Sequence, residues 1–409
     1  MELEVRIERL GAQGDGVTQG PEGPLFVPFT LPGELVKVEA APGEPRAEPL
    51  AILEPSPERV LPVCQYFGTC GGCALQHMET QAYLAWKREQ VIAALASRGL
   101  EVPIGEAQPV PLASRRRAAF TLGRTARGIA FGYRGARSHD IVDIEACPVL
   151  SPDIAGRLPK LKSALAPLLG GKREARITVT ETGQGLDLVV EGLRPSPPLL
   201  AKLAAAGAGI GAARITVDGE SVILACEPTV TLSGAQVRLP PGAFLQASRE
   251  AEAALVGLVR QGVGRSKRVA DLFAGIGTFT FALAASAEVD AYEQDEAAIA
   301  AIGQAARATP KLKPVRTFAR DLFRAPITTR ELAHYDAVVL DPPRAGAKAQ
   351  SETLAASSVP KLVMVSCNPG TSARDLRVLV DGGYRITRVV PIDQFLFSPH
   401  IELVAELEK

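Results

Sequence analysis

Residues 268–284, RVADLFAGIGTFTFALA, decide the fold of this 409-residue chain. An apolar run leads into Gly275-Ile276-Gly277, and a second apolar run with helical spacing follows. A strand, a glycine turn and a helix in this order are typical of the first unit of a doubly wound sheet. Strand-like and helix-like segments alternate from Arg268 onward, so we predict an α/β fold for the carboxyl-terminal part of the chain.

The turn at Gly275 is predicted to bind a nucleoside. Asp271 precedes it, and Glu293 ends the next strand-like segment (EVDAYEQD), where a carboxylate can accept hydrogen bonds from both ribose hydroxyls. The turn lacks the spacing of a dinucleotide-binding GxGxxG loop, and no Lys-Ser or Lys-Thr pair follows it as in a P-loop. A ligand without a pyrophosphate is therefore favoured over a dehydrogenase cofactor, and S-adenosylmethionine is the obvious candidate.

The next three strand-like segments end at Asp321, Asp341 and Cys367. Ligands of open α/β sheets bind outside the carboxyl ends of the strands, so we interpret Cys367, in the sequence VSCNP, as a covalent nucleophile. A structural cysteine in the core is the alternative. Asp341-Pro-Pro-Arg344 is similar to the Asp-Pro-Pro-aromatic motif of amino-methyltransferases. Those enzymes need the aromatic ring to stack a flipped-out base, so Arg344 indicates another chemistry.

A cysteine-rich segment, CQYFGTCGGC at residues 64–73, predicts a metal site. It contains Cys64, Cys70 and Cys73, and Cys147 supplies a distant fourth thiolate. Four thiolates suit zinc or an iron–sulfur cluster, and the spacing favours [4Fe-4S] because zinc sites usually come as two close cysteine pairs. We expect Cys226 to belong to the core, and we expect His77 to lie at the surface rather than to be a fifth ligand.

The middle of the chain contains a strongly basic stretch. The net charge of the whole chain is +0, so any nucleic-acid binding must come from a local patch. Between Leu112 and Ser138 there are arginines at 115, 116, 117, 124, 127, 134 and 137 and no acidic residue, interleaved with Phe120, Phe131 and Tyr133. We favour contact with RNA here, since arginine binds phosphate and stacks on bases; a solvated charged face is the alternative. Gly207–Gly211 imitates a nucleotide-binding loop but lies between a helix and a strand, the reverse of the required order.

Residues 1–55 alternate apolar and polar residues between Gly and Pro clusters, which is typical of a small β-barrel. This stretch resembles a TRAM domain, an OB-like RNA-binding barrel, in the following residues: Ile7, Leu10, Gly14, Gly16, Phe26-Val27 and Leu31-Pro32-Gly33-Glu34. A β-domain without a ligand is the alternative. Residues 75–98 have helical spacing of apolar residues.

Three carboxyl-terminal motifs together resemble the RNA uracil-5-methyltransferase family: Asp341-Pro-Pro-Arg-Ala-Gly346, Ser366-Cys367-Asn368-Pro369 and Asp393-Gln-Phe with His400-Ile-Glu402. With the TRAM-like start and the four cysteines, the resemblance spans essentially the whole chain and is greatest to the ribosomal-RNA members. It implies that the four cysteines hold [4Fe-4S], that Cys367 is the nucleophile and that Glu402 is the base. It also implies an S-adenosylmethionine site formed by Gln246, Phe273, Thr278, Glu293, Asp321 and Asp341.

The resemblance is incomplete around the cofactor. Ser248 and Thr278 stand where members often have Asn, and the Asn-Ala pair usual in the helix after Glu293 is absent (GQAARAT). The nucleophile and the base are unaffected by these departures. The family's chemistry explains both residues: C5 of uracil becomes nucleophilic when a thiolate adds at C6, and a base must then remove the C5 proton. His400 is the rival to Glu402 as that base.

The predicted architecture is a Rossmann-like methyltransferase domain (246–409), an OB-like TRAM barrel (1–55) and a central α+β cluster-binding domain (56–245). The resemblance also implies that the helix at about 75–98 packs with the methyltransferase domain. We predict methylation of uridine C5, with 23S ribosomal RNA favoured over transfer RNA as substrate. The alternatives are a non-catalytic iron–sulfur RNA-binding protein and a cytosine C5 methyltransferase. The charged opening MELEVRIERL and the absence of a membrane-length apolar run predict a cytoplasmic protein that does not span a membrane. No obligatory protein partner is evident, so a monomer is expected, although the sequence carries no direct signal of the oligomeric state.

Overall fold

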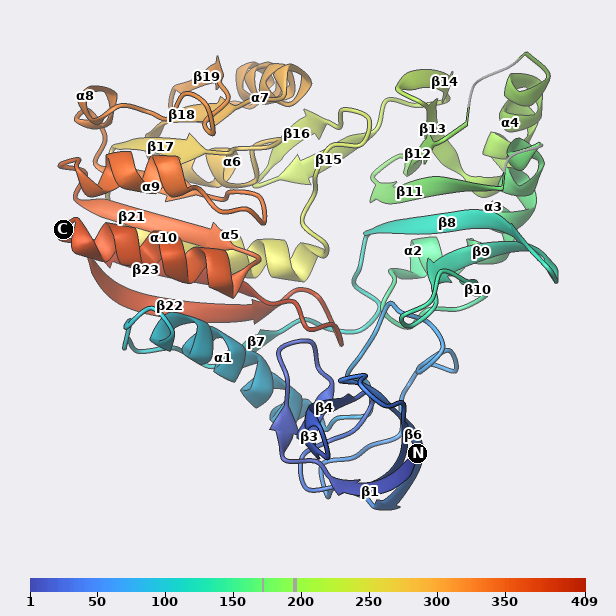
Figure 1. Cartoon of the computed structure of the whole chain (residues 1–409). Helices are drawn as coiled ribbons and strands as arrows, with labels where there is room; N and C mark the ends of the chain where they lie inside the picture. The colour runs from blue at the N-terminus through green and yellow to red at the C-terminus, as the bar shows by residue number, and fades with distance from the viewer. Residues whose placement is uncertain (171–172, 194–196) are drawn as a thin grey trace.

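The computed structural model describes residues 1–170, 173–193 and 197–409. Amino-terminal strands form one lobe, a central sheet forms a second, and a larger sheet with helices on its faces forms the third (Figure 1). Within the described ranges, no helix has the length and apolar character needed to cross a bilayer.

The amino-terminal lobe consists of two three-stranded antiparallel sheets with the orders β1-β5-β6 and β2-β3-β4. Their strands are β1 (Glu2–Arg6), β2 (Arg9–Leu10), β3 (Gly16–Gly20), β4 (Gly23–Val27), β5 (Leu35–Ala40) and β6 (Ala47–Glu54). Ile7, Val27 and Val36 belong to one buried cluster between the sheets. A Cβ at Gly16 would lie 2.2 Å from Thr30 Oγ1, so only glycine fits there. The all-β prediction is confirmed, whereas the resemblance to a TRAM domain stays a prediction.

The central lobe is a seven-stranded sheet with the order β10-β9-β8-β11-β12-β13-β14. The strands are β8 (Arg117–Thr125), β9 (Gly128–Arg134), β10 (Ile141–Asp143), β11 (Glu174–Thr182), β12 (Gly185–Glu191), β13 (Ala212–Val217) and β14 (Glu220–Leu224). Leucines of α3 (Leu158–Leu165) pack on the sheet together with Phe120 and Phe131. Short α2 (Pro152–Ala155) and η1 (Ala166–Leu169) flank α3, and α4 (Pro197–Ile210) connects the parallel strands β12 and β13. Most of the Gly207–Gly211 segment is therefore the last turn of α4, which agrees with its exclusion as a nucleotide loop.

The carboxyl-terminal lobe is an eight-stranded sheet with the order β19-β18-β17-β20-β21-β23-β22-β7. Its strands are β7 (Gln108–Pro109), β17 (Arg268–Leu272), β18 (Glu288–Glu293), β19 (Val315–Ala319), β20 (Ala337–Leu340), β21 (Lys361–Ser366), β22 (Arg385–Asp393) and β23 (Glu402–Glu408). The helices are α5 (Arg249–Val263), α6 (Thr278–Ala284), α7 (Glu296–Ala308), α8 (Thr329–Leu332), α9 (Lys348–Ala355) and α10 (Pro369–Asp381). The hairpin β15 (Thr229–Leu232) and β16 (Ala235–Arg238) packs against α6 and α7.

The stretch that begins this sheet forms as predicted: β17, a glycine turn and α6, with all seven residues of α6 buried. Gly277 has φ +96°, and a Cβ there would lie 2.7 Å from the ring of Phe281, so the turn requires glycine at this position. The predicted α/β fold of the carboxyl-terminal part is thereby confirmed.

An earlier part of the chain completes this lobe. Helix α1 (Thr80–Ala96) packs against α10 and β22, and β7 pairs in parallel with the end of β22 (Figure 1). The helix begins at Thr80, because Glu79 caps it by accepting hydrogen bonds from the N–H groups of Gln81 and Ala82. The sequence pattern placed its start five residues too early.

Two predictions about burial are wrong. Cys226 is exposed, because it lies beyond the end of β14 rather than within a core strand. His77 is fully buried against the rings of Phe29 and Phe67, and burial lowers its pKa to about 4. Neither ring nitrogen of His77 has a hydrogen-bond partner among the described side chains and backbone.

A buried ion pair joins α1 to the end of β22. Lys87 Nζ lies 2.8 Å from Asp393 Oδ1, both side chains are fully buried, and Lys87 also donates to the carbonyl of His400. We predict that Lys87→Met lowers the free energy of unfolding by about 3–5 kcal/mol, because Asp393 would remain buried without its counter-ion. Urea unfolding followed by the fluorescence of Trp86, the single tryptophan, measures this.

Lys348→Met is the matched control. Its pair with Glu352 is exposed, so the loss should stay below about 1 kcal/mol. A loss for Lys87→Met as small as that of the control would contradict the prediction.

Candidate active site

The register of the carboxyl-terminal sheet brings the predicted site residues to one edge. Strands β17, β18, β20 and β21 are parallel, so Glu293, Asp341 and Cys367 follow or end them on the same side. Strand β23 runs antiparallel to β21, with Leu403 opposite Ser366. Glu402, the first residue of β23, is therefore a cross-strand neighbour of Cys367.

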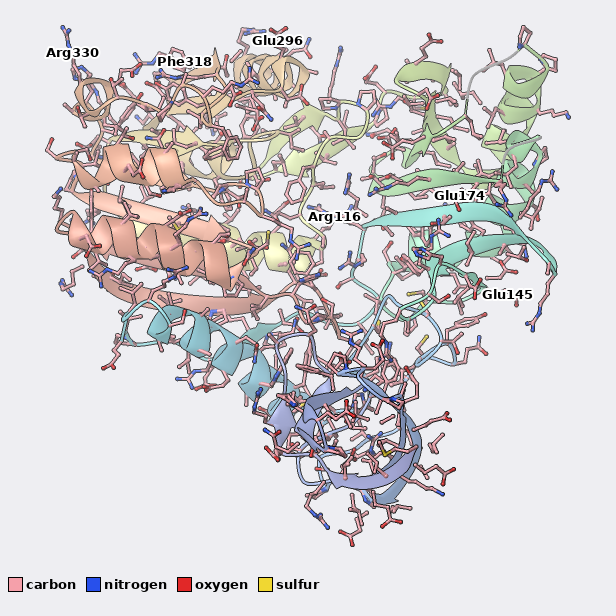
Figure 2. All side chains as sticks on the ribbon, viewed as in Figure 1. Arg116, Glu145, Glu174, Glu296, Phe318 and Arg330 are labelled. Atoms are coloured by element: carbon pink, nitrogen blue, oxygen red, sulfur yellow. The ribbon has the colours of Figure 1, made fainter. Side chains whose placement is uncertain are left out.

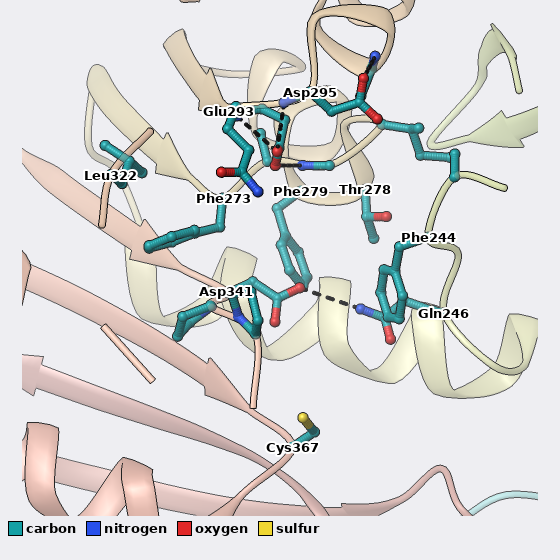
Figure 3. Close-up of a pocket in the computed structure, with 18 of the residues that line it drawn as sticks. Phe244, Gln246, Phe273, Thr278, Phe279, Glu293, Asp295, Leu322, Asp341 and Cys367 are labelled. Carbon is teal, nitrogen blue, oxygen red and sulfur yellow. Dashed lines mark hydrogen bonds between the residues drawn. The ribbon is translucent and has the colours of Figure 1, made fainter. Parts of the chain in front are cut away.

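These residues line one cavity of about 410 Å³ (Figure 3). It contains seven of the predicted residues: Gln246, Phe273, Thr278, Glu293, Asp341, Cys367 and Glu402. Asp321 is not part of the lining; its carboxylate accepts hydrogen bonds from the N–H groups of Phe323 and Arg324 and so shapes the turn at the rim. One cavity thus has room for a nucleoside at the Glu293 end and for a reacting base at the Cys367 end.

Glu293 is held by backbone groups. One carboxylate oxygen accepts the N–H of Gly275 at 3.0 Å, and the other accepts those of Gln294 and Asp295 at 2.8 and 3.1 Å. The glycine turn and the end of β18 are thereby fixed to each other. Phe273, which has φ +62°, places its ring 5.4 Å from that of Phe323. The carboxylate and the two rings are suited to bind a ribose and an adenine.

Two aspartates lie near the glycine turn: Asp271 is fully buried, whereas Asp341 is partly exposed in the cavity wall. Burial raises the pKa of Asp271 to about 7, although Thr280 donates a hydrogen bond to it. Burial and the nearby Asp271 carboxyl raise the pKa of Asp341 to about 7. A positive charge in the cavity, such as a sulfonium, would stabilise the ionised form of Asp341.

Gln394 connects the two ends of the cavity. Its Nε2 donates to Gln246 Oε1 at 2.9 Å and to Glu402 Oε2 at 2.8 Å, and Gln246 Nε2 lies 3.4 Å from Asp341 Oδ2. The sequence predicted no role for Gln394, although this residue lies inside the motif Asp393-Gln-Phe. Its place directly after β22 and beside β23 could have indicated that it faces Glu402.

The environment of Cys367 favours the thiol over the thiolate. Burial, with the Glu402 and Asp341 carboxyls, raises the pKa of Cys367 to about 11, and the Arg344 guanidinium acts in the opposite direction. His400, the rival base, lines a different cavity and is bound by Arg344, whose guanidinium lies 3.2 Å from its Nδ1. The geometry therefore places Glu402, not His400, beside the sulfur.

Two of the three departures from the family pattern, Ser248 and Thr278, can be placed in the structure. Ser248 caps α5, since its Oγ accepts the N–H of Ala251 at 3.0 Å. Thr278 is the first residue of α6 and faces the cavity. Ser248 itself does not line the cavity, so its replacement of Asn changes the helix cap rather than the cavity wall.

The four cysteines of the predicted metal site line a second cavity of about 470 Å³. No three His, Cys, Asp or Glu residues within the described ranges are arranged to bind a single metal ion. A cubane cluster separates its thiolates more widely than a single ion does, because each thiolate binds a different iron. Four thiols around one cavity, with the N–H of Gly72 3.4 Å from Cys70 Sγ, provide the number and type of ligands that such a cluster requires.

The basic stretch is partly neutralised by acids from other segments. Arg116 is buried and pairs with Glu252 of α5 at 2.5 Å, at the boundary between the central and carboxyl-terminal lobes (Figure 2). Arg134 binds Glu174 with two hydrogen bonds, and Arg137 lies 3.6 Å from Glu48. Part of the predicted patch therefore has a structural role. The sequence did not indicate this role, because the acidic partners lie outside residues 112–138.

The sheet, the glycine turn and the cavity shared by Glu293 and Cys367 define a Rossmann-like methyltransferase. Residues 235–409 match the family model described as tRNA (Uracil-5-)-methyltransferase. An RNA methyltransferase of Rhizobium meliloti is 49% identical, covering 99% of both chains. The 23S rRNA (uracil(1939)-C(5))-methyltransferase RlmD of Chromohalobacter salexigens is 35% identical, covering 97% of this chain and 87% of that protein.

A solved structure has the same fold: the Pyrococcus abyssi tRNA (uracil-54, C5)-methyltransferase in complex with S-adenosyl-L-homocysteine. It matches with a TM-score of 0.73 and 24% identity, covering 99% of this chain and 100% of that one. This chain belongs to the RNA uracil-5-methyltransferase family and is an S-adenosylmethionine-dependent RNA methyltransferase.

The raised pKa of Cys367 predicts its reactivity. Because only the thiolate is alkylated, labelling of Cys367 by iodoacetamide should rise about tenfold per pH unit between pH 7 and 9, well below its pKa of about 11. Arg344→Met should slow labelling at every pH, since the guanidinium stabilises the thiolate. Peptide mass spectrometry measures both rates, and the exposed Cys226 reports the reagent's own behaviour. Equal rates with and without Arg344 would contradict this assignment.

Proposed function

We propose that this protein transfers a methyl group from S-adenosylmethionine to C5 of a uridine in 23S ribosomal RNA. The observation that carries the proposal is the shared cavity in which Cys367 and Glu402, on neighbouring antiparallel strands, face the residues suited to bind the cofactor. Gln246, Phe273, Thr278, Glu293 and Asp341 would contact the cofactor, and Asp321 would shape the turn beside it. A 23S rRNA methyltransferase among the relatives that align over nearly the whole chain supports the substrate.

The chain's own residues account for each bond change. The Cys367 thiolate adds to C6 of uracil, and the electron pair of the C5–C6 double bond moves toward the C4 carbonyl, which gives an enolate. When bound, S-adenosylmethionine would supply an electrophilic methyl group to C5; its S–CH3 bond would break, and S-adenosylhomocysteine would leave. Glu402 then takes the C5 proton, the pair left behind restores the C5–C6 double bond, and the Cys367–C6 bond breaks to release the thiolate.

The electrostatics suit this order of events. Burial and the Asp341 carboxyl raise the pKa of Glu402 well above its usual value, so its carboxylate is a stronger base than an exposed glutamate. Arg344 lies at the rim, where its charge favours the thiolate of Cys367. The uridine must leave its stack to reach the sulfur, so a single-stranded or distorted segment of RNA is the expected substrate.

Cys64, Cys70, Cys73 and Cys147 would hold a [4Fe-4S] cluster with a structural role, since methyl transfer moves no electrons to a metal. The TRAM-like barrel (1–55) and the central domain (56–245) would bind RNA beside the methyltransferase domain (246–409). Arg115 lines the cysteine cavity, and its guanidinium lies 5.9 Å from the ring of Phe395, which lines both cavities. Transfer RNA is the second candidate substrate, which the family model and the archaeal structure favour.

Cys367→Ala should abolish methylation, whereas Cys226→Ser should leave it unchanged because Cys226 is exposed and distant from the cavity lining. Ribosomal and transfer RNA containing 5-fluorouridine should trap the wild-type protein as a covalent adduct, since C5 then has no proton to lose. Peptide and nucleotide mapping of the adduct identifies the sulfur and the uridine. Full methylation by Cys367→Ala, or methylated cytidine as the product, would overturn the mechanism; tight RNA binding without methylation would favour a non-catalytic protein.

Protein purified without oxygen should contain iron and sulfide in equal amounts, close to four of each per chain. Cys73→Ser should lose both, because Cys73 lines the cysteine cavity, whereas Cys226→Ser should keep them. Metal analysis and the visible absorption spectrum measure this outcome. Stoichiometric zinc without sulfide would overturn the cluster assignment.

A further inference from the structure

Both polar atoms of the Gln394 side chain are hydrogen-bonded, and these bonds fix the orientation of its amide. This residue follows β22 directly and is almost completely buried. Its Oε1 accepts the backbone N–H of Ala247 at 3.0 Å, and a backbone N–H can only donate. The amide nitrogen must therefore point the other way, toward Gln246 and Glu402. Turning the amide over would lose three hydrogen bonds at once.

This orientation determines how its two partners lie. Gln246 Oε1 accepts from Gln394, so Gln246 Nε2 faces Asp341 Oδ2. Glu402 Oε2 accepts the other N–H of Gln394, which leaves Oε1 as the oxygen free for another contact. The same amide thus orders one residue at the cofactor end of the cavity and one at the Cys367 end.

We propose that Gln394 is a positioning residue that orients Glu402 and stabilises its carboxylate for removal of the C5 proton. This inference rests on the proposed function. In that step the C5–H bond breaks, the proton passes to Glu402, and the electron pair restores the C5–C6 double bond as the bond from C6 to Cys367 breaks. Gln394 touches neither the proton nor the reacting carbons; it acts through Glu402.

The electrostatic surroundings give the direction of the effect. Burial and Asp341 raise the pKa of Glu402, and the hydrogen bond from Gln394 lowers it. The other charged or titratable groups nearby are Arg344 in the loop after β20, Cys367 after β21, His400 before β23, and Lys87 of α1 paired with Asp393 of β22. Removing the donor alone should therefore raise the pKa of Glu402 further.

The test is Gln394→Met, which keeps the length of the side chain and removes both donors. Because the base acts as a carboxylate, the rising limb of the single-turnover rate against pH should move to higher pH by about one unit. At pH values below the midpoint of this rise, product release should be about tenfold slower than in the wild-type protein. More protein should then be found as the covalent RNA adduct after acid quenching. The KM for the cofactor should change less than kcat.

Gln350→Met is the matched control. Gln350 is equally buried and bonds the backbone of Ile327 away from the cavity, so this variant should lose stability without moving the pH profile. If Gln394→Met does not fold, Gln394→Glu tests the same inference. An added acid beside Glu402 should also raise its pKa and so move the rising limb of the pH profile to higher pH. A wild-type pH profile and adduct level in the folded variant would overturn the inference. Absence of methylation by the wild-type protein would instead overturn the proposed function.

Discussion

The hydrogen-bonded register of the carboxyl-terminal sheet is the constraint on which the site depends. Parallel strands β17, β18, β20 and β21 end at one edge, and β23 begins at that edge because it runs in the opposite direction. A shift of β23 by one residue would turn Glu402 to the other face of the sheet and remove the carboxyl from the cavity. Backbone pairing alone makes Cys367 and Glu402 neighbours, independently of any interaction between their side chains.

Segments far apart in the sequence stabilise this edge. The buried Arg116 of the central lobe donates to the carbonyl of Gln246 and pairs with Glu252, which fixes the segment before α5. The N–H groups of Ala74 and Leu75, directly after Cys73, both donate to the carbonyl of Phe397. The cysteine segment is therefore joined by hydrogen bonds to the loop between β22 and β23, which leads to Glu402.

Local patterns predicted the parts of the molecule that local physics determines. The glycine turn, the strand ends at Glu293 and Asp341, and the place of Cys367 follow from periodicity and from the geometry of parallel sheets. Burial of His77 and exposure of Cys226 depend on how distant segments pack. The local pattern of apolar and polar residues around each of them therefore could not predict it. The same holds for Arg116, whose acid lies in α5, and for Gln394, whose role depends on a backbone N–H at residue 247.

The position of β23 has a consequence for biosynthesis. This strand is inserted between β21 and β22, so the sheet has a gap until residues 402–408 leave the ribosome. A nascent chain that ends before them exposes two unpaired strand edges and lacks Glu402. The partly synthesised polypeptide is therefore prone to aggregation and has an incomplete cavity wall, and both conditions end together when β23 pairs with β21 and β22.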